Sequence, residues 1–469
     1  MDLASIGLLL ALVTIFYSSF GGEIKNAFWL APLLTVLIFF ACWLLVRPQK
    51  YFLGDLVVYF GTAIIILSIS ILGKLNFTYS FYFFTYLAVA LVACFFTYFG
   101  LKQLLHVKKM SLRSLEGLRR PMILFLVLAC LICFLYFSNV IWNWGSEEGE
   151  VNIKAFQTLL QGTSPYSKLY LMEYSWAKGT VTPYSYFPVT LLYYGLFSTF
   201  PTSPVSAFPS FSGLKVGTML ATVVAAILLL KTFKELKNES FGRFLFILYI
   251  FLFGFAWGGL DYIHSFAGFL IILTVYFLAT GKNQLSLASA GFTALTQPIG
   301  TLFGIFVIAH IIRKTKSKVF AWKSVMALAP SVVIFSAFFF WDWQGFTKNI
   351  FGWWSGSYGN AAGTYFGSSS VASFTYFLSP AIEMVGSRTF LVAKILAMLI
   401  LGIFLLLKYT QTIPRTLFSA TVFIATWLFF VNSWISIMYL QELIITSLLL
   451  LGFLAISGRV TSRKPAETP

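Results

Sequence analysis

The sequence predicts an all-α fold, that of a polytopic integral membrane protein built as a helical bundle. Of the 469 residues, 59% are hydrophobic and only 10% are charged, and the mean hydropathy is +0.86. Apolar runs of about 20 residues, the length that crosses a bilayer as a helix, recur along the whole chain. This pattern predicts roughly 13 to 15 membrane segments and no separate soluble domain.

The expected membrane segments follow from the apolar runs one by one. They cover residues 4–20, 27–46, 53–73, 78–100, 121–142, 186–200, 214–231, 243–259, 262–280, 285–312, 321–341, 390–407, 416–432 and 437–456. Four cysteines lie within these runs, at Cys42, Cys94, Cys130 and Cys133. We interpret them as small core residues rather than as a metal or redox site, because buried cysteine packs as a small hydrophobe.

The basic residues predict how the chain is oriented. The net charge is +17, and Lys and Arg concentrate in short loops such as 102–120 and 313–318. Such loops normally stay in the cytoplasm, close to anionic lipid headgroups. The charge therefore indicates membrane lipids as partners, and nucleic acid is not expected.

With the basic loops inside, two long and nearly neutral loops, 143–185 and 342–389, lie on the outer face. The expected organisation has six parts: an N-terminal four-helix membrane unit (1–101), a basic loop with the first core span (102–142), outer loop 1 (143–185), core spans (186–341), outer loop 2 (342–389), and C-terminal spans with a basic tail (390–469). The protein is expected in the plasma membrane, with its active site outside.

The middle of the chain allows two threadings. If 186–200 crosses the membrane fully, the basic stretch 231–243 falls on the outside, against the charge pattern. If 186–200 is a short or re-entrant segment, the basic stretch 231–243 is cytoplasmic, as the charge pattern favours. In that arrangement, 285–297 and 299–312 form a short hairpin bent at Pro298, and Asp261, His264 and Gln297 lie at the outer surface. The acidic residues after the run 121–142 are expected at the same surface. A single kinked helix over the same residues is the alternative, since proline is tolerated inside membrane helices.

An acid cluster stands at the start of outer loop 1. Glu147, Glu148 and Glu150 directly follow an apolar run. They fit the first turn of a helix capped by Ser146, and Glu150 with Lys154 fits an ordinary i, i+4 pair. This structural explanation accounts well for Glu150 but less well for two adjacent acids, because charge near a membrane is costly.

The parts that follow the cluster have a recognisable order. A helix-like run ends at Gly162, the segment Ser164–Pro165–Tyr166 comes next, and after 16 residues the segment 182–197 (TPYSYFPVTLLYYGLF) begins an apolar run. This order over residues 121 to 390 resembles that of the GT-C glycosyltransferases, which use polyprenyl-phosphate-linked sugars. It is most similar to the polyprenyl-phosphate mannosyltransferases and more distantly to the lipid A aminoarabinose transferase.

The resemblance implies a GT-C-type helical bundle and a set of site residues. The family's catalytic aspartate lies about 15 residues before a glycine, and Glu147 lies 15 residues before Gly162. Glu147 is therefore expected as the general base, with Glu148 as the neighbouring acid and the alternative base. GLDYIHSF (259–266) resembles the family's outer Asp turn and points to Asp261, and LTQPIG (295–300) resembles a lysine-containing turn in which Gln297 replaces the lysine.

Cationic and aromatic residues of the outer loops are further candidates for substrate binding. Arg388 is the leading candidate for the donor phosphate, because a guanidinium matches phosphate geometry. The remaining candidates are His264, which could carry a proton or orient Asp261, three lysines for the phosphate, and rings that could stack on sugars: Lys154, Lys168, Lys178, Tyr166, Tyr184, Tyr186, Trp353 and Trp354. Each lysine also fits an interfacial anchor.

These features together predict a membrane enzyme that moves a hexose, most plausibly mannose, from a polyprenyl-phosphate donor to a lipid, glycan or protein acceptor. A carboxylate base and direct displacement imply inversion at the anomeric carbon, with no metal and no soluble cofactor. A flippase or transporter of lipid-linked saccharides is the main alternative. A polymerase or ligase of lipid-linked glycans is the second, although outer loop 2 holds only one arginine.

Overall fold

The computed structural model describes residues 146–175, 178–199, 210–239, 242, 245–246, 249, 264–314, 318–354, 370–372, 387–428, 434–436 and 440–461. The chain divides into two compact units, Asn139–Thr446 and a unit made of Met1–Ser138 with Ser447–Pro469. Nearly all described residues belong to the first unit. The expected four-helix unit 1–101, the cysteines and Asp261 lie outside the described residues.

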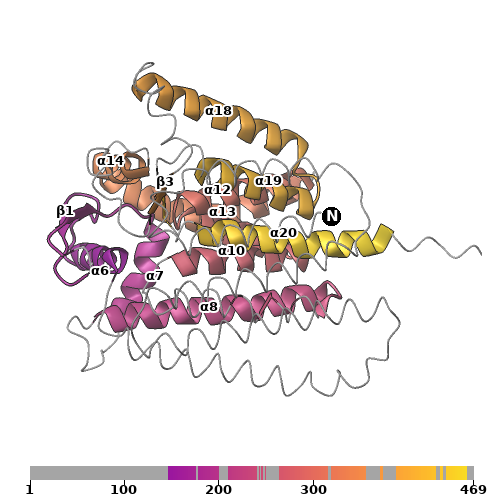
Figure 1. Ribbon diagram of the computed structural model, residues 1–469, viewed down its shortest axis with the longest axis horizontal. Helices are drawn as coiled ribbons and strands as arrows, with labels where there is room; N and C mark the ends of the chain where they lie inside the picture. Colours follow the sequence, from indigo (N-terminus) through magenta and orange to yellow (C-terminus); the bar gives the residue numbers. More distant parts are fainter. Residues whose placement is uncertain are drawn as a thin grey trace, which may run out of the picture. The chain divides into compact units, whose positions relative to one another are not determined.

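The described chain is mostly helical, as the composition predicts (Figure 1). Its elements are α6 (Glu147–Leu160), β1 (Leu169–Leu171), β2 (Val181–Pro183), α7 (Pro188–Ser198), α8 (Ser210–Glu235), α10 (His264–Ala279), α11 (Asn283–Ala294), α12 (Pro298–Lys314), α13 (Lys318–Trp341), α14 (Trp343–Trp354), β3 (Ser370–Ala372), α18 (Ser387–Lys408), α19 (Ile413–Thr426), β4 (Trp434–Ser436) and α20 (Leu440–Thr461). Two short antiparallel pairs, β1–β2 and β3–β4, are the departure from a purely helical fold.

A row of packed helices forms the core of the first unit. Helix α10 packs against α8 and α11, α11 packs against α12 and α13, and α12 packs against α19. In Figure 1, α8 and α10 run alongside each other. Buried hydroxyls join α10 to α11: Thr274 Oγ1 donates to Ser289 Oγ at 2.8 Å and lies 3.3 Å from Thr293 Oγ1. Such hydrogen bonds between helices are common where helices pack within a membrane.

Among the residues that the structure describes, two helices are long and apolar enough to cross a membrane, over Gly213–Glu235 in α8 and Trp322–Trp341 in α13. They differ in their surroundings. Most of the α8 stretch is buried within the protein, whereas only 11% of the α13 stretch is. Large apolar side chains of α13 are therefore exposed, among them Trp322 at 67% and Phe340 at 77%.

The middle of the chain follows the threading with a short segment and a hairpin. Helix α7 has 11 residues, so it spans about 16 Å and is too short to cross a hydrocarbon core of about 30 Å. Helix α11 ends at Ala294, α12 begins at Pro298, and the two helices pack against each other. The alternative, one kinked helix over 285–312, is therefore wrong.

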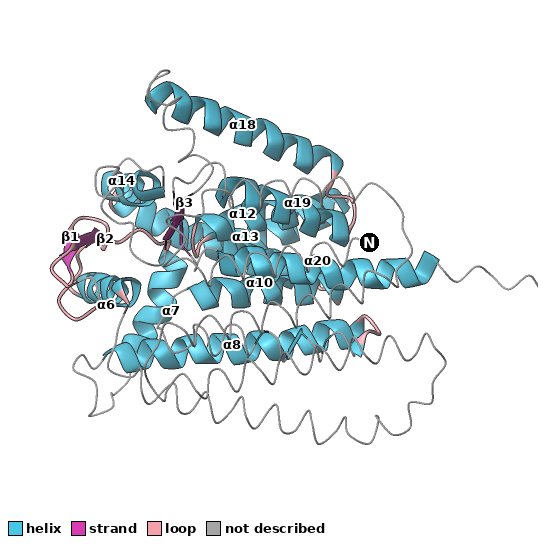
Figure 2. Cartoon of the chain, in the orientation of Figure 1, coloured by secondary structure: helices cyan, strands magenta, loops and turns pink. Residues whose placement is uncertain are grey.

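Outer loop 1 is folded rather than irregular. Helix α6 occupies its first part, and β1 pairs with β2 so that Tyr170 lies opposite Thr182 (Figure 2). Outer loop 2 also begins with a helix, α14, instead of the expected loop. Asn349 of α14 donates to the carbonyl oxygen of Tyr166 at 2.8 Å, which ties the start of the second outer loop to the first.

Candidate functional site

Helix α6 begins as the sequence predicts. Ser146 has an extended backbone, and its hydroxyl accepts a hydrogen bond from the Gly149 amide at 2.9 Å. The chain leaves the helix at Gly162, whose positive φ of 74° is the left-handed conformation in which helices commonly end. The N-terminal turn therefore carries all three acids, where the partial positive charge of the helix end favours carboxylates.

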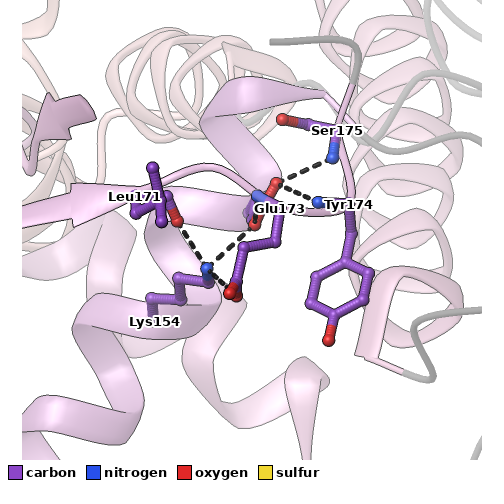
Figure 3. A network of polar contacts seen from close by, with 6 residues as sticks. Lys154, Leu171, Glu173, Tyr174 and Ser175 are labelled. Atoms are coloured by element: carbon purple, nitrogen blue, oxygen red, sulfur yellow. Dashed lines mark hydrogen bonds and ion pairs between the residues drawn. The ribbon is translucent and has the colours of Figure 1, made fainter. Parts of the chain in front are cut away.

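The three acids of this turn point to three different partners, and Glu150 has a structural one. Its buried carboxylate accepts hydrogen bonds from three consecutive backbone amides, those of Glu173 (2.6 Å), Tyr174 (3.1 Å) and Ser175 (2.7 Å). Lys154 Nζ lies 3.0 Å from Glu150 Oε1, 2.7 Å from Glu173 Oε2 and 2.5 Å from the carbonyl oxygen of Leu171. Figure 3 shows this network, in which Lys154 reaches the strand-end loop from α6.

Burial acts to raise the pKa of Glu150, but the backbone and lysine contacts outweigh it and lower the pKa below its usual value. Glu150 and Lys154 thus hold outer loop 1 together, as the structural explanation of this pair predicts. Because Lys154 is engaged with two carboxylates, it is a poor candidate for the donor phosphate.

Glu147 turns toward the β1–β2 pair, where the Thr182 hydroxyl donates to its carboxylate. Burial raises the pKa of Glu147, Thr182 opposes this shift, and the charges of Glu148 and Glu150 add to it. The raised pKa of Glu147 suits a general base, whereas the hydrogen bond from Thr182 occupies one of its carboxylate oxygens.

Glu148 turns toward the buried ends of three other helices. Its Oε1 lies 3.8 Å from His264 Nε2, at the start of α10. The opposite ring nitrogen, His264 Nδ1, lies 3.0 Å from Oε1 of Glu442, in the first turn of α20. Gln297, which directly precedes α12, donates from its side-chain amide to the same Glu442 oxygen. We call Glu148, His264, Gln297 and Glu442 the polar cluster.

The polar cluster lies where α6, α10, α12 and α20 begin. His264 and Glu442 are fully buried, Gln297 is 1% exposed, and the Glu148 side chain keeps 16% exposure. Glu148 is therefore the member through which the cluster reaches the surface. Among the described residues, Oε2 of Glu148 and Oε2 of Glu442 make no hydrogen bond, so each carboxylate keeps one unused acceptor.

The segment before α7 is anchored next to this cluster. The amides of Phe187 and Val189 donate to the carbonyl oxygens of Thr296 (3.1 Å) and Leu295 (3.2 Å), in the turn between α11 and α12. This anchoring brings the Tyr186 ring edge-on to His264, with ring centroids 6.2 Å apart. The Thr190 hydroxyl also donates to the carbonyl oxygen of Thr296, 106 positions further along the chain, at 2.8 Å. These bonds join the Tyr-Pro segment to the Gln297 turn.

The three predicted tyrosines are covered by protein. Tyr166 is 1% exposed, Tyr184 is fully buried, and Tyr186 is 4% exposed. The Tyr166 hydroxyl donates to the Tyr186 carbonyl oxygen at 2.9 Å, and the Tyr184 hydroxyl accepts from Asn152 at 3.2 Å. These rings therefore form the packed support of outer loop 1, and their contact with a sugar stays a prediction.

The predicted phosphate ligands are not brought to the polar cluster in the part of the chain that the structure describes. Lys168 is exposed and lies over the Tyr170 ring at 5.6 Å, and Lys178 is exposed in the turn before β2. The backbone of Arg388 belongs to α18, but its side chain, those of Trp353 and Trp354, and the segment 355–369 lie outside the described residues. The role of Arg388 stays a prediction.

Sequence reasoning missed Glu442. It is the one charged residue in the apolar run 437–456, and an ionisable residue within such a run is itself a signal of function. The clustering of Glu148, His264 and Gln297 was expected only in general terms, as residues on one outer surface. Among the described residues, no group of three or more His, Cys, Asp or Glu has the arrangement of a metal site.

The arrangement can perform proton chemistry. Because a carboxylate oxygen accepts hydrogen bonds, the contact with Glu442 places a proton on His264 Nδ1. The Nε2 edge then faces Glu148, the one member open to the surface.

Comparison with protein-family models, with curated proteins and with solved structures finds no match for this chain.

Proposed function

We propose that this protein is a multi-pass membrane glycosyltransferase of the GT-C type that takes a hexose, most plausibly mannose, from a polyprenyl-phosphate donor. The acceptor is a lipid, glycan or protein at the outer face of the plasma membrane. The observation that carries the proposal is the polar cluster. Three residues singled out by the resemblance, Glu148, His264 and Gln297, come together although they stand up to 149 positions apart: Glu148 lies against His264, and Glu442 joins His264 to Gln297.

The exposed apolar surface supports a place in the membrane. Along α13 and α18, large apolar side chains are exposed that a water-facing helix would keep covered. They include Trp322, Val325, Met326, Val332, Val333, Phe340, Val392, Leu396, Leu399, Ile400, Ile403 and Leu407. The donor and acceptor chains would reach the site from the lipid that covers such helices.

The contacts favour Glu148 as the general base, one position from the register that the resemblance suggests. Glu148 is partly exposed and faces an imidazole, whereas Glu147 is held by Thr182. In the proposed step, Glu148 takes the proton of the acceptor hydroxyl as that oxygen bonds to the anomeric carbon. The bond from this carbon to the phosphate oxygen breaks, and its electron pair leaves with the polyprenyl phosphate. Displacement from the opposite side inverts the anomeric centre.

The test uses purified protein in nanodiscs with a panel of radiolabelled polyprenyl-phosphate sugars and a membrane glycolipid extract as acceptor. Removal of a general base typically costs 10²- to 10⁴-fold in rate. We expect a loss of about 100-fold or more in Glu148→Gln, and near wild-type transfer in Glu173→Gln, which neutralises an exposed acid of the same loop. If Glu147→Gln alone is inactive, the function stands and the base is Glu147.

A proton-coupled transporter of lipid-linked saccharides is the second candidate. The buried pair Glu442–His264 favours it, because transporters carry such ionisable pairs within their helices. The two candidates differ in what happens to the donor. A transporter moves the intact lipid-linked sugar between leaflets of a liposome without cleaving it, whereas the transferase releases polyprenyl phosphate.

A further inference from the structure

We propose that Glu442 and Gln297 are positioning residues that fix the His264 imidazole, so that its Nε2 edge faces Glu148. This inference rests on the proposed function, because it assigns them a role at the same site. Neither residue reaches a surface: Glu442 is fully buried and Gln297 is 1% exposed. They act on the reaction through His264 alone, and Glu148 remains the residue that meets the acceptor.

The contacts define one orientation of the ring. His264 has two ring nitrogens, and Glu442 Oε1 at 3.0 Å from Nδ1 accepts the proton that this nitrogen carries. Glu148 Oε1 lies on the other side of the ring, 3.8 Å from Nε2. A carboxylate that accepts from one imidazole nitrogen fixes the orientation of the ring, and here it turns the Nε2 edge toward the Glu148 carboxylate.

Gln297 in turn limits where the Glu442 carboxylate can lie. Its amide donates to Oε1, the same oxygen that receives His264 Nδ1. The residue is held by its place in the chain, since the next residue is the proline that begins α12 and the preceding turn is bonded to Phe187 and Thr190. The amide of a glutamine donates but carries no charge, so it orients the carboxylate without neutralising it.

The burial of Glu442 argues against a purely stabilising role for its carboxylate. Burial of a carboxylate among apolar helices is unfavourable unless its contacts offset the loss of hydration. Oε2 of Glu442 makes no hydrogen bond with the described residues, so the side chain uses only part of its bonding capacity. A methionine of similar size would pack in this place without that cost, and we therefore assign the carboxylate to the control of His264.

The first measurement is independent of activity. The chain holds three histidines, His106, His264 and His310, so ¹⁵N-histidine labelling gives a spectrum simple enough to assign with His264→Gln and His310→Gln. In Glu442→Met the acceptor for Nδ1–H is lost while the Glu148 carboxylate still faces Nε2, so we expect the proton to leave His264 Nδ1 and Nε2 to be the protonated nitrogen. His310 is the internal control, because its Nδ1 partner is the carbonyl oxygen of Thr410 at 2.7 Å.

The second measurement is sugar transfer. In Glu442→Met we expect kcat to fall about 10- to 100-fold, the usual effect of removing an orienting partner, while KM for the donor stays within about threefold of wild type. Glu442→Gln keeps an acceptor oxygen, so we expect it to retain the proton on His264 Nδ1 and an intermediate kcat. Monodisperse elution and an unchanged unfolding temperature exclude misfolding as the cause.

The outcomes separate this inference from the proposed function. If His264 Nδ1 stays protonated in Glu442→Met, the inference is overturned, and the same holds if this proton is lost while kcat is unchanged. If the wild type transfers no sugar from any donor, the proposed function fails, while the ¹⁵N measurement still decides whether Glu442 positions His264.

Discussion

Neutralising Glu150 tests the interpretation that one of the three clustered acids is structural. Glu150 is fully buried and accepts three backbone N–H groups, from residues 173, 174 and 175, in addition to the ion pair with Lys154. In Glu150→Gln the shape is kept and the charge is lost. The side-chain NH₂ of the glutamine would also face at least one of these backbone N–H groups, with which it cannot form a hydrogen bond.

The size of the effect follows from the number of bonds. A hydrogen bond to a charged group contributes about 1.5–3 kcal/mol, and one between neutral groups about 0.5–1.5 kcal/mol. Loss of charge therefore removes about 1 kcal/mol from each bond, or about 3 kcal/mol over the three amides. At 1.36 kcal/mol for each factor of ten, this corresponds to about a 100-fold increase in local opening.

Hydrogen–deuterium exchange measures this opening directly at the amides of residues 173–175. We expect about a 100-fold loss of protection in Glu150→Gln, spread over the loop between β1 and β2. The matched control is Glu173→Gln. The Glu173 side chain is 52% exposed and pairs with Lys154 at the surface, so its neutralisation should cost well under about 1 kcal/mol. Equal protection in wild type and Glu150→Gln would refute the reasoning.

The same carboxylate gives a pH dependence with a defined sign. The contacts hold the pKa of Glu150 below its usual value, so its stabilising effect is complete above the ordinary glutamate pKa of about 4.3. It is lost as the pH falls through the lowered pKa of the folded state. After correction for intrinsic exchange rates, protection of the loop should persist near pH 5 and decline below about pH 4, and Glu150→Gln should lack this decline.

Three further predictions concern other contacts. Thr182→Val removes the hydroxyl that lowers the pKa of Glu147, so this pKa should rise further. If Glu148 is the base, the acidic limb of the pH–rate profile stays in place. A shift of that limb to higher pH would assign the base to Glu147. Gly195→Ala should destabilise the α6–α7 contact by about 1–3 kcal/mol, because an added Cβ overlaps the Phe156 ring; an unchanged unfolding temperature would contradict this. Arg313→Met removes donors to the carbonyl oxygens of residues 406 (2.9 Å) and 407 (2.8 Å) at the end of α18 and should cost about 1 kcal/mol, seen as faster exchange in that last turn, with Arg415→Met as the near-silent control.

Much of the local structure could be predicted from sequence, because local chemistry determines it. The cap at Ser146, the end of α6 at Gly162 and the break before Pro298 each depend on residues within a few positions. The Glu150–Lys154 pair follows from helical spacing alone. The apolar runs also located the described helices α8, α10, α13, α18, α19 and α20.

The composition of the polar cluster could not be predicted in the same way. Glu442 meets His264 across 178 positions of chain, and only the packing of α10 and α20 brings their first turns together. The three backbone donors to Glu150 depend on where the loop after β1 turns back, which side-chain patterns do not encode. A register taken from resemblance also cannot separate Glu147 from Glu148, because adjacent residues on a helix face different neighbours.

Sugar transfer by the wild-type protein tests the central claim most directly. Nanodiscs carrying the protein would receive the radiolabelled polyprenyl-phosphate sugars and the glycolipid acceptor, and the product linkage would be analysed for its anomeric configuration. The proposal predicts label on the acceptor with inverted configuration and equimolar release of polyprenyl phosphate. Intact donor that only changes leaflet, with no label on any acceptor, would contradict it and favour a transporter.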